Sequence, residues 1–220
     1  MQKTNTQPDE EKILKIGIMG GTFNPIHYGH LVTAQEALIQ FKLDRVVFIP
    51  SGKPPHKHNS HIIDAEHRYL MTVMATASNS KFFVSRIEID RKGKSYTIDT
   101  LRELKKIYGK NSALYFITGA DAILEILTWK DTEDIFELCK FIAATRPGYN
   151  LSRLEELKEK LFNNKKTANV NTNEKIFVME IPALAISSTD IRNRIKANRP
   201  INYLLPESVC NYLLKHGLYK

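Results

Sequence analysis

The chain has 220 residues and a mass of 25.2 kDa, which fits one large domain or one domain with a small appendage. Hydrophobic residues make up 42% and charged residues 25%, as in a protein that buries a sizeable core, and no run of about 18 apolar residues exists, which argues against a membrane span. The net charge of +8 favours anionic partners, either polynucleotides or small phosphorylated substrates, without choosing between them.

Short apolar runs alternate with segments of helical periodicity from residue 13 onward. Residues 1–12 are polar and lack the apolar segment of a secretory signal, so we expect a flexible tail. In the first half of the chain we predict strands over residues 13–19, 45–49 and 82–89. The helices predicted between and after them cover residues 30–41, 64–78 and 97–108, and a loop rich in Pro, Lys and His covers residues 50–61.

The alternation continues to the end of the chain. We predict strands over residues 113–118, 140–145 and 175–181, and helices over residues 151–162, 188–197 and 206–215. A polar stretch at residues 163–174 is expected to form a surface loop. This pattern predicts an α/β fold with a doubly wound, mostly parallel sheet and helices on both faces. We expect a single domain over residues 13–220, including a small C-terminal helical part at about 186–220.

The segment GGTFNPIHYGH, residues 20–30, follows a predicted strand and opens a predicted helix. Gly20 and Gly21 let the backbone approach a ligand closely, and the helix N-terminus offers unpaired N–H groups to phosphate. His27 and His30 project from one face of the helix start, where two donors suit the stabilisation of charge on a phosphoryl group. The segment is neither a Walker A loop nor a Gly-x-Gly-x-x-Gly fingerprint, which disfavours hydride chemistry on a nicotinamide cofactor.

The tetrapeptide HYGH at residues 27–30 resembles the His/Thr-x-Gly-His signature of the nucleotidyltransferase superfamily. The longer segment is similar to that of bacterial nicotinate-nucleotide adenylyltransferases, and ISSTDIR at residues 186–192 matches that family's second signature. Further matches, in chain order, are PSGKPPHK (50–57), SYTIDTL (95–101), GAD (119–121), WKD (129–131), RPGY (146–149), YLLPE (203–207) and HGLY (216–219). The resemblance covers residues 13–220 and implies a Rossmann-like nucleotidyltransferase fold.

The second signature also has a physical rationale. Ser187, Ser188 and Thr189 are typical helix-capping residues, and Arg192 lies one turn into the predicted helix. This helix start can hold phosphate oxygens, and Arg192 can add a charge-assisted contact; a simple cap with a surface arginine is the alternative. The resemblance implies an ATP site formed by Gly20, Gly21, Thr22, Phe23, His27, His30, Gly119, Asp121, Ile186, Ser187, Ser188 and Arg192.

The resemblance also implies a site for the second substrate. In the family, an aromatic side chain at the position of Trp129 stacks on the pyridine ring of the nucleotide, and backbone N–H groups near it and near Thr97 hold the carboxylate. We carry these roles to Trp129, Lys130 and Thr97, with core packing as the alternative for Trp129. Asp121 is expected to contact ribose hydroxyls, or else to cap a helix. Phosphate contacts or, alternatively, solvated loop charges are expected at Lys53, His56, Lys57 and Arg146.

The two remaining features concern metals and one departure from the family pattern. His56, His58 and His61 have a loop spacing that is weak evidence for zinc, so we predict no dedicated metal ligands. Asn24 occupies a position at which Asp is frequent in the family. Asn keeps the local turn hydrogen bond but removes a negative charge near the phosphates, and we expect little effect on the chemistry.

The implied reaction is transfer of AMP from ATP to nicotinate mononucleotide, giving deamido-NAD and pyrophosphate. The attacking phosphate is already ionised at pH 7, so no general base or covalent intermediate is required, and catalysis is expected to be positioning with charge stabilisation. His27 and His30 are expected at the α-phosphate, and Arg192 with the helix start at Ser187 and Ser188 at the other phosphates. Mg²⁺ is expected to arrive bound to ATP.

Several alternatives stay open. Adenylyl transfer to phosphopantetheine or to nicotinamide mononucleotide would use the same centre, although the Trp129 region and the chain length argue against phosphopantetheine. The basic charge suggests an RNA-binding module, but no RNP-type motif is present, and we expect no nucleic-acid partner. A non-catalytic sensor would bind ATP without releasing pyrophosphate.

Cellular context is indicated by the cysteines. Cys139 and Cys210 are too few and too far apart in sequence for a disulfide framework or a Cys-based zinc site. We therefore expect a cytoplasmic protein with no membrane partner, for which a homodimer is compatible with the sequence.

Overall fold

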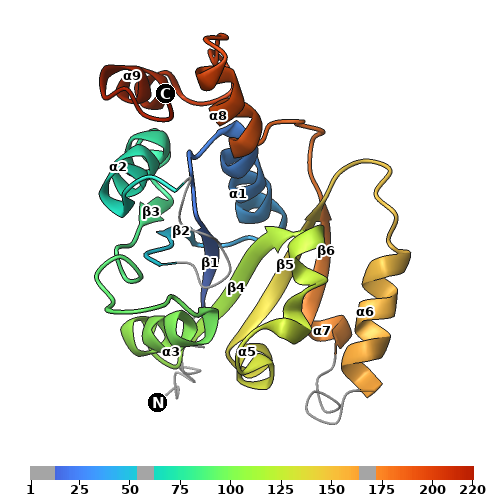
Figure 1. Cartoon of the computed structure of the whole chain (residues 1–220). Coiled ribbons are helices and arrows are strands. Elements are labelled where there is room, and N and C mark those ends of the chain that lie inside the picture. The colour runs from blue at the N-terminus through green and yellow to red at the C-terminus, as the bar shows by residue number, and fades with distance from the viewer. Residues whose placement is uncertain (1–12, 54–61, 164–171) are drawn as a thin grey trace, which may run out of the picture.

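The computed structural model describes residues 13–53, 62–163 and 172–220, and in them a six-stranded parallel sheet forms the centre of the molecule (Figure 1). The strand order is β3-β2-β1-β4-β5-β6. The strands are β1 (Leu14–Gly21), β2 (Arg45–Pro50), β3 (Phe82–Val84), β4 (Ser112–Gly119), β5 (Cys139–Thr145) and β6 (Ile176–Glu180).

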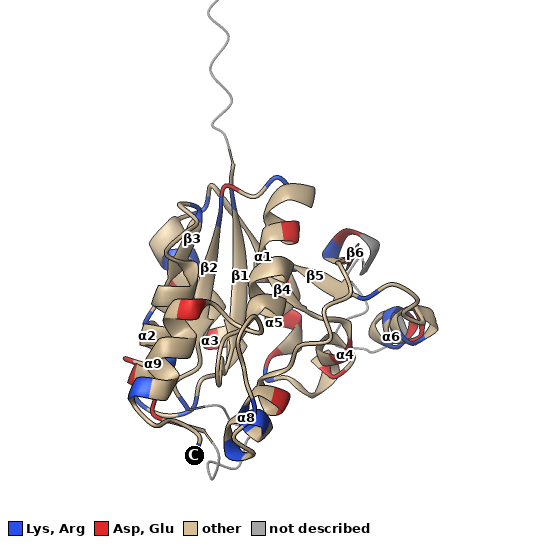
Figure 2. Cartoon of the chain, turned by 90° about the horizontal axis from the view of Figure 1, so that it is seen from above, with Lys and Arg blue, Asp and Glu red and all other residues tan. Residues whose placement is uncertain are grey.

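Helices cover both faces of the sheet. The first group packs on one face and consists of α1 (Tyr28–Gln40), α2 (Ala65–Thr76), α8 (Ser188–Lys196) and α9 (Glu207–Lys215). The second group packs on the other face and consists of α3 (Thr97–Tyr108), α5 (Thr132–Leu138) and α6 (Ser152–Asn163). Figure 2 shows α2 and α9 together at the β3 edge of the sheet and α6 at the opposite edge.

Alternation along the strands explains the two cores. In β1, Ile16 and Ile18 face the α3 side, while Met19 faces the α1 side, because successive side chains of a strand point to opposite faces. Both faces are apolar, which is why the strands read as almost continuous hydrophobic runs. The fold class predicted from the sequence is therefore confirmed, with every ladder of the described sheet parallel.

The strand order places a crevice at the centre of the sheet. β1 pairs with β2 on one side and with β4 on the other, so the connections after these strands run in opposite directions. In open α/β sheets ligands bind in the crevice that this reversal leaves at the carboxyl ends of the strands. The segment GGTFNPIHYGH, residues 20–30, begins at the end of β1 and carries His27 and His30; we call it the first motif.

Several predicted boundaries are wrong. The strand predicted over residues 82–89 ends at Val84, because Ser85 makes the last bond to β2 and residues 86–90 then form a turn closed on the carbonyl of Arg86. Short helical elements that we did not predict are α4 (Ala120–Ile123), the 3₁₀ turn η2 (Ile126–Thr128), α5 and α7 (Thr172–Lys175). The predicted tail, residues 1–12, lies outside the described residues.

None of the helices in residues 13–53, 62–163 and 172–220 combines the length and the apolar character that crossing a bilayer requires.

Candidate active site

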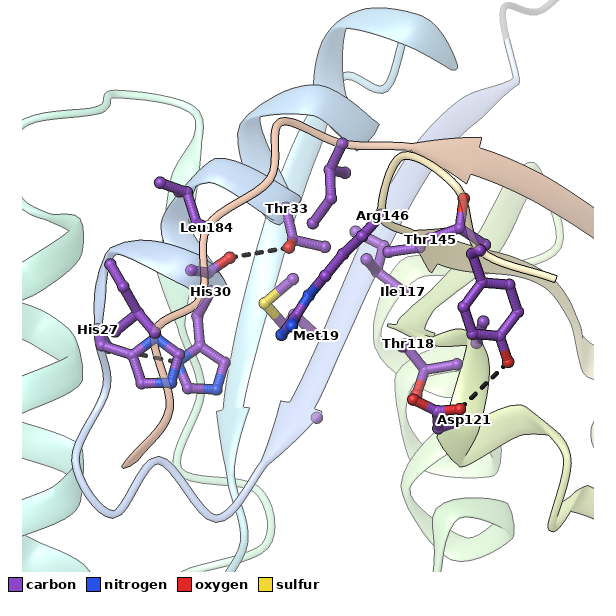
Figure 3. Close-up of a pocket in the computed structure, with 18 residues that line it drawn as sticks. Met19, His27, His30, Thr33, Ile117, Thr118, Asp121, Thr145, Arg146 and Leu184 are labelled. Atoms are coloured by element: carbon purple, nitrogen blue, oxygen red, sulfur yellow. Dashed lines mark hydrogen bonds between the residues drawn. The ribbon is translucent and has the colours of Figure 1, made fainter. Parts of the chain in front are cut away.

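A cavity of about 500 Å³ opens at the carboxyl ends of β1, β4 and β5, at the reversal of strand order. One wall comes from β1 and α1, the floor from the ends of β4 and β5, and the remaining wall from the segment after β6. Figure 3 shows His27 and His30 on one side of this cavity and Thr118 and Asp121 on the other. Of the predicted ATP-site residues, those that line the cavity are Gly20, His27, His30, Gly119, Asp121 and Ile186.

The two histidines are stacked at the start of α1, with ring centroids 3.8 Å apart. The backbone N–H of His27 donates to Nδ1 of His30 at 3.2 Å, so Nδ1 acts as an acceptor and the ring proton is assigned to Nε2. Phe23, which is buried, packs edge-on against the His30 ring at 5.1 Å. The structure therefore presents His30 as a neutral N–H donor held from two sides.

Burial keeps His27 neutral as well. Its side chain is 7% exposed, and desolvation lowers the pKa of His27 to about 4. At neutral pH His27 therefore brings no positive charge to the site, and Arg146 is a cationic side chain in the cavity lining.

The depressed pKa of His27 predicts a pH-dependent stability. Between pH 6.5 and 4 the unfolded chain protonates this histidine while the folded chain does not, so stability falls as the pH falls through this window. At about pH 4.5 the loss from this one group is about 2–3 kcal/mol.

Urea unfolding of wild type and His27→Gln at about pH 7 and 4.5 measures this contribution. We expect the variant to lose less stability on acidification than the wild type, whereas His216→Gln, which alters an exposed histidine, should behave as wild type. Equal losses in the wild type and His27→Gln would contradict the neutral, buried state of His27.

The second motif, ISSTDIR at residues 186–192, contains the start of α8 and contacts the first motif. Ser187 caps this helix by accepting from the N–H of Asp190, and the Ser188 hydroxyl donates to the carbonyl of Pro25 at 2.8 Å. Arg192, which is partly buried, donates from Nη1 to the carbonyl of Asn24 at 2.8 Å. The two motifs therefore meet, with Ser188 and Arg192 bonded to the backbone of the first motif behind the cavity wall.

Arg146 lies in the cavity rather than beside Trp129. It follows β5, is exposed, and extends across the opening toward Met19 (Figure 3). The cavity lining also contains six of the residues predicted for ATP and none of Lys53, Thr97, Trp129 and Lys130, so Arg146 lies with the former group. Tyr149, which we did not assign, also lines the cavity, and its hydroxyl donates to Asp121 at 3.1 Å.

Three residues predicted to bind the second substrate, Lys53, Thr97 and Lys130, lie around the start of α3. Thr97 is the first residue of this helix, and the Lys130 Nζ lies 4.9 Å from the ring centroid of Tyr96, the residue before it. Lys53 reaches the same place, because its carbonyl accepts from the N–H of Ser95 at 3.1 Å. None of Lys53, Thr97 and Lys130 lines the cavity described above.

Trp129 packs against the core and is partly exposed. Its ring packs edge-on against Phe116 and Phe141, with centroids 5.9 and 6.3 Å away, yet the residue is only partly buried. His56, Lys57, His58 and His61 lie outside the described residues.

Sequence reasoning missed Arg68, a residue on the buried face of α2. It is 1% exposed, and its guanidinium donates to the carbonyls of Thr22 at 2.8 Å, Ile63 at 3.1 Å and Gly52 at 3.3 Å. A Cβ on Gly52 would lie 2.1 Å from the carbonyl oxygen of Glu88, so this loop passes too close to its neighbour for any side chain. The available signal was the helical spacing of Arg68 with buried positions of the same helix.

Comparisons with known proteins agree with this architecture. The model of the cytidylyltransferase-like family matches residues 18–194. A probable nicotinate-nucleotide adenylyltransferase of Thermoanaerobacter sp. (strain X514) is 56% identical over 210 residues, 96% of each chain. One of the same name from Moorella thermoacetica is 58% identical over 206 residues, 94% of this chain and 92% of the relative.

A solved structure supports the fold. The Plasmodium falciparum nicotinic acid mononucleotide adenylyltransferase complexed with NaAD superposes with a TM-score of 0.70 at 23% identity, covering 93% of this chain and 97% of that one. Taken with the identity to the curated relatives over nearly their whole length, the two joined motifs show that the chain belongs to the cytidylyltransferase-like family and, within it, to the nicotinate-nucleotide adenylyltransferases.

Proposed function

We propose that this chain transfers AMP from ATP to nicotinate mononucleotide, releasing pyrophosphate and forming deamido-NAD. The observation that carries this proposal is the His27–His30 pair at the strand-order crevice, with Ser188 and Arg192 of α8 bonded to the backbone of the same motif. Membership of the adenylyltransferase family supports the same reaction.

The cavity suits the adenylyl donor. The phosphate of the mononucleotide attacks the α-phosphorus in line, and the bond to the leaving pyrophosphate breaks without a covalent enzyme intermediate. The Nε2–H of His30 is placed to donate to an α-phosphate oxygen as charge develops there. Arg146 supplies a positive charge within the same cavity, and Arg192 supplies one behind the first motif.

Magnesium is proposed to enter with ATP as part of the substrate. The polar groups that line the cavity are histidines, hydroxyls, Arg146 and Asp121, and Asp121 is already bonded to Tyr149. This set fits phosphate oxygens better than a bare divalent cation, which prefers several oxygen ligands, so the phosphates themselves would hold the ion.

The start of α3 suits the carboxylate of nicotinate. The helix has 12 residues, and its first N–H groups carry the positive end of the helix dipole next to Lys130. A carboxylate is stabilised there, whereas the neutral amide of nicotinamide gains no charge interaction. Trp129, held edge-on by two phenylalanines, offers a fixed aromatic surface for the pyridine ring.

The test measures pyrophosphate release with MgATP and three acceptors: nicotinate mononucleotide, nicotinamide mononucleotide and phosphopantetheine. We expect strong preference for the nicotinate acceptor, with the dinucleotide identified by mass. Trp129→Ala should raise KM for the nicotinate acceptor by about tenfold or more and leave KM for ATP unchanged, as loss of one stacking contact predicts.

Other outcomes separate the alternatives. Turnover with phosphopantetheine alone would preserve the histidine centre and discard the Trp129 site. ATP binding without turnover on any acceptor would favour a nucleotide sensor.

A cytoplasmic location is part of the proposal. Cys139 and Cys210 are both buried and unpaired, as is usual in a reducing compartment.

A further inference from the structure

Tyr219 reaches the first motif from the segment that follows α9. Its hydroxyl donates to Oδ1 of Asn24 at 2.7 Å, and the same oxygen accepts from the N–H of Ile63 at 3.3 Å. The backbone carbonyl of Asn24 is the acceptor for Arg192. One buried asparagine, 5% exposed, therefore links Tyr219 to the arginine of the second motif.

The backbone of Tyr219 is itself unusual. Its φ of 67° lies in the left-handed region, which residues with side chains seldom adopt and which persists where surrounding contacts hold it. The ring packs against the core shared by α1, α2 and α8. The segment thus holds a strained conformation in which the hydroxyl points at Asn24.

The hydroxyl stays a donor at every physiological pH. Burial raises the pKa of Tyr219, and the neighbouring guanidiniums of Arg192 and Arg68 offset only part of that rise. A protonated hydroxyl facing a carbonyl-type oxygen at 2.7 Å gives the interaction a fixed direction.

We propose that Tyr219 is a positioning residue, which orients Arg192 through Asn24 and thereby tightens ATP binding. The proposal rests on the proposed function, in which Arg192 supplies a positive charge at the first motif, next to the cavity that takes ATP. Without the hydroxyl, Oδ1 of Asn24 loses the shorter of its bonds to Tyr219 and Ile63, and the carbonyl that aligns Arg192 is less well fixed. The residues proposed to bind the mononucleotide lie around the start of α3, whereas the bonds of this relay run to Ile63 and Arg192, so we expect binding of the mononucleotide to be unaffected.

The test compares Tyr219→Phe with wild type. We expect KM for ATP and the ATP dissociation constant to rise about fivefold, as loss of one hydrogen bond predicts, with KM for nicotinate mononucleotide unchanged. Tyr203→Phe is the matched control, because it removes a hydroxyl from a tyrosine that is 91% exposed, and it should behave as wild type. If the role of Tyr219 were purely structural, Tyr219→Phe would lower thermal stability without changing KM for ATP relative to KM for nicotinate mononucleotide.

A double-mutant cycle tests the route through Asn24. In an Asn24→Ala background, Tyr219→Phe should cause no further change in ATP binding, whereas in Asn24→Asp, which retains an acceptor oxygen, the change should persist. Unchanged ATP binding in Tyr219→Phe, or equal changes in the wild-type and Asn24→Ala backgrounds, would overturn the inference. Since ATP titration needs no turnover, it gives this answer even if the wild type fails to form the dinucleotide, which would refute the proposed function separately.

Discussion

Replacing His30 with alanine is expected to lower kcat by about 10²–10³-fold, the usual effect of removing one preorganised donor to a developing charge. The ring is fixed by the His27 N–H and by Phe23, so its Nε2–H needs no reorientation as the reaction proceeds. KM for ATP should change much less, because the donor acts mainly when charge accumulates in the transition state.

Single-turnover and steady-state assays of His30→Ala check this expectation. His67→Ala is the matched control: it removes a partly buried imidazole that bonds Tyr212 and does not line the cavity. We expect near wild-type kcat in the control. A kcat of His30→Ala within about threefold of wild type would refute the role given to His30.

Arg68→Met is expected to destabilise the fold by about 3 kcal/mol, because the substitution leaves three backbone carbonyls without their donor at roughly 1–3 kcal/mol each when buried. Relief of the desolvation of a buried guanidinium offsets part of this cost. For a chain of this size the loss corresponds to a Tm lower by about 6–12 °C.

Arg86→Met supplies the comparison. Arg86 also makes several bonds, to Glu66 and Asp90, but on the surface, where ion pairs contribute little to stability. Thermal and urea unfolding should therefore separate the two variants clearly, and Arg68→Lys should fall between them because one amine cannot reach three carbonyls. Equal stability of Arg68→Met and Arg86→Met would show that the carbonyl contacts of Arg68 contribute little.

The fold could be predicted from the sequence because each strand and each long helix is specified by a pattern within its own segment. Each of the six strands is an apolar run at least three residues long, and the long helices repeat at helical spacing. The unpredicted elements are short: α5 has seven residues and begins after Asp131 in a left-handed conformation, so it shows too few turns for a periodic pattern. The third strand was overextended because nothing local distinguishes Ile87 and Ile89 from strand residues.

The candidate site likewise has features that one segment specifies and features that depend on contacts between distant segments. The first motif is contiguous, so its glycines and histidines could be assigned a chemistry from spacing alone. Only the family resemblance linked this motif with the segment that forms α8. The roles of Arg68, Tyr149 and Tyr219 depend on packing between segments distant in sequence. The hydrogen bonds of Arg68 described above run to backbone carbonyls, which every residue type carries, so the sequence does not reveal them.

The carbonyls of Asn24 and Pro25 and the side chain of Asn24 are bonded by donors from the last part of the chain. The bonds from Ser188, Arg192 and Tyr219 span 163, 168 and 195 residues. During synthesis the sheet and α1 can therefore assemble while the loop between β1 and α1 still lacks these three restraints, and loop closure over such separations is slow. Catalytic competence becomes a late property of folding, and recovered activity reports completion of the native state more faithfully than recovered helix or strand content.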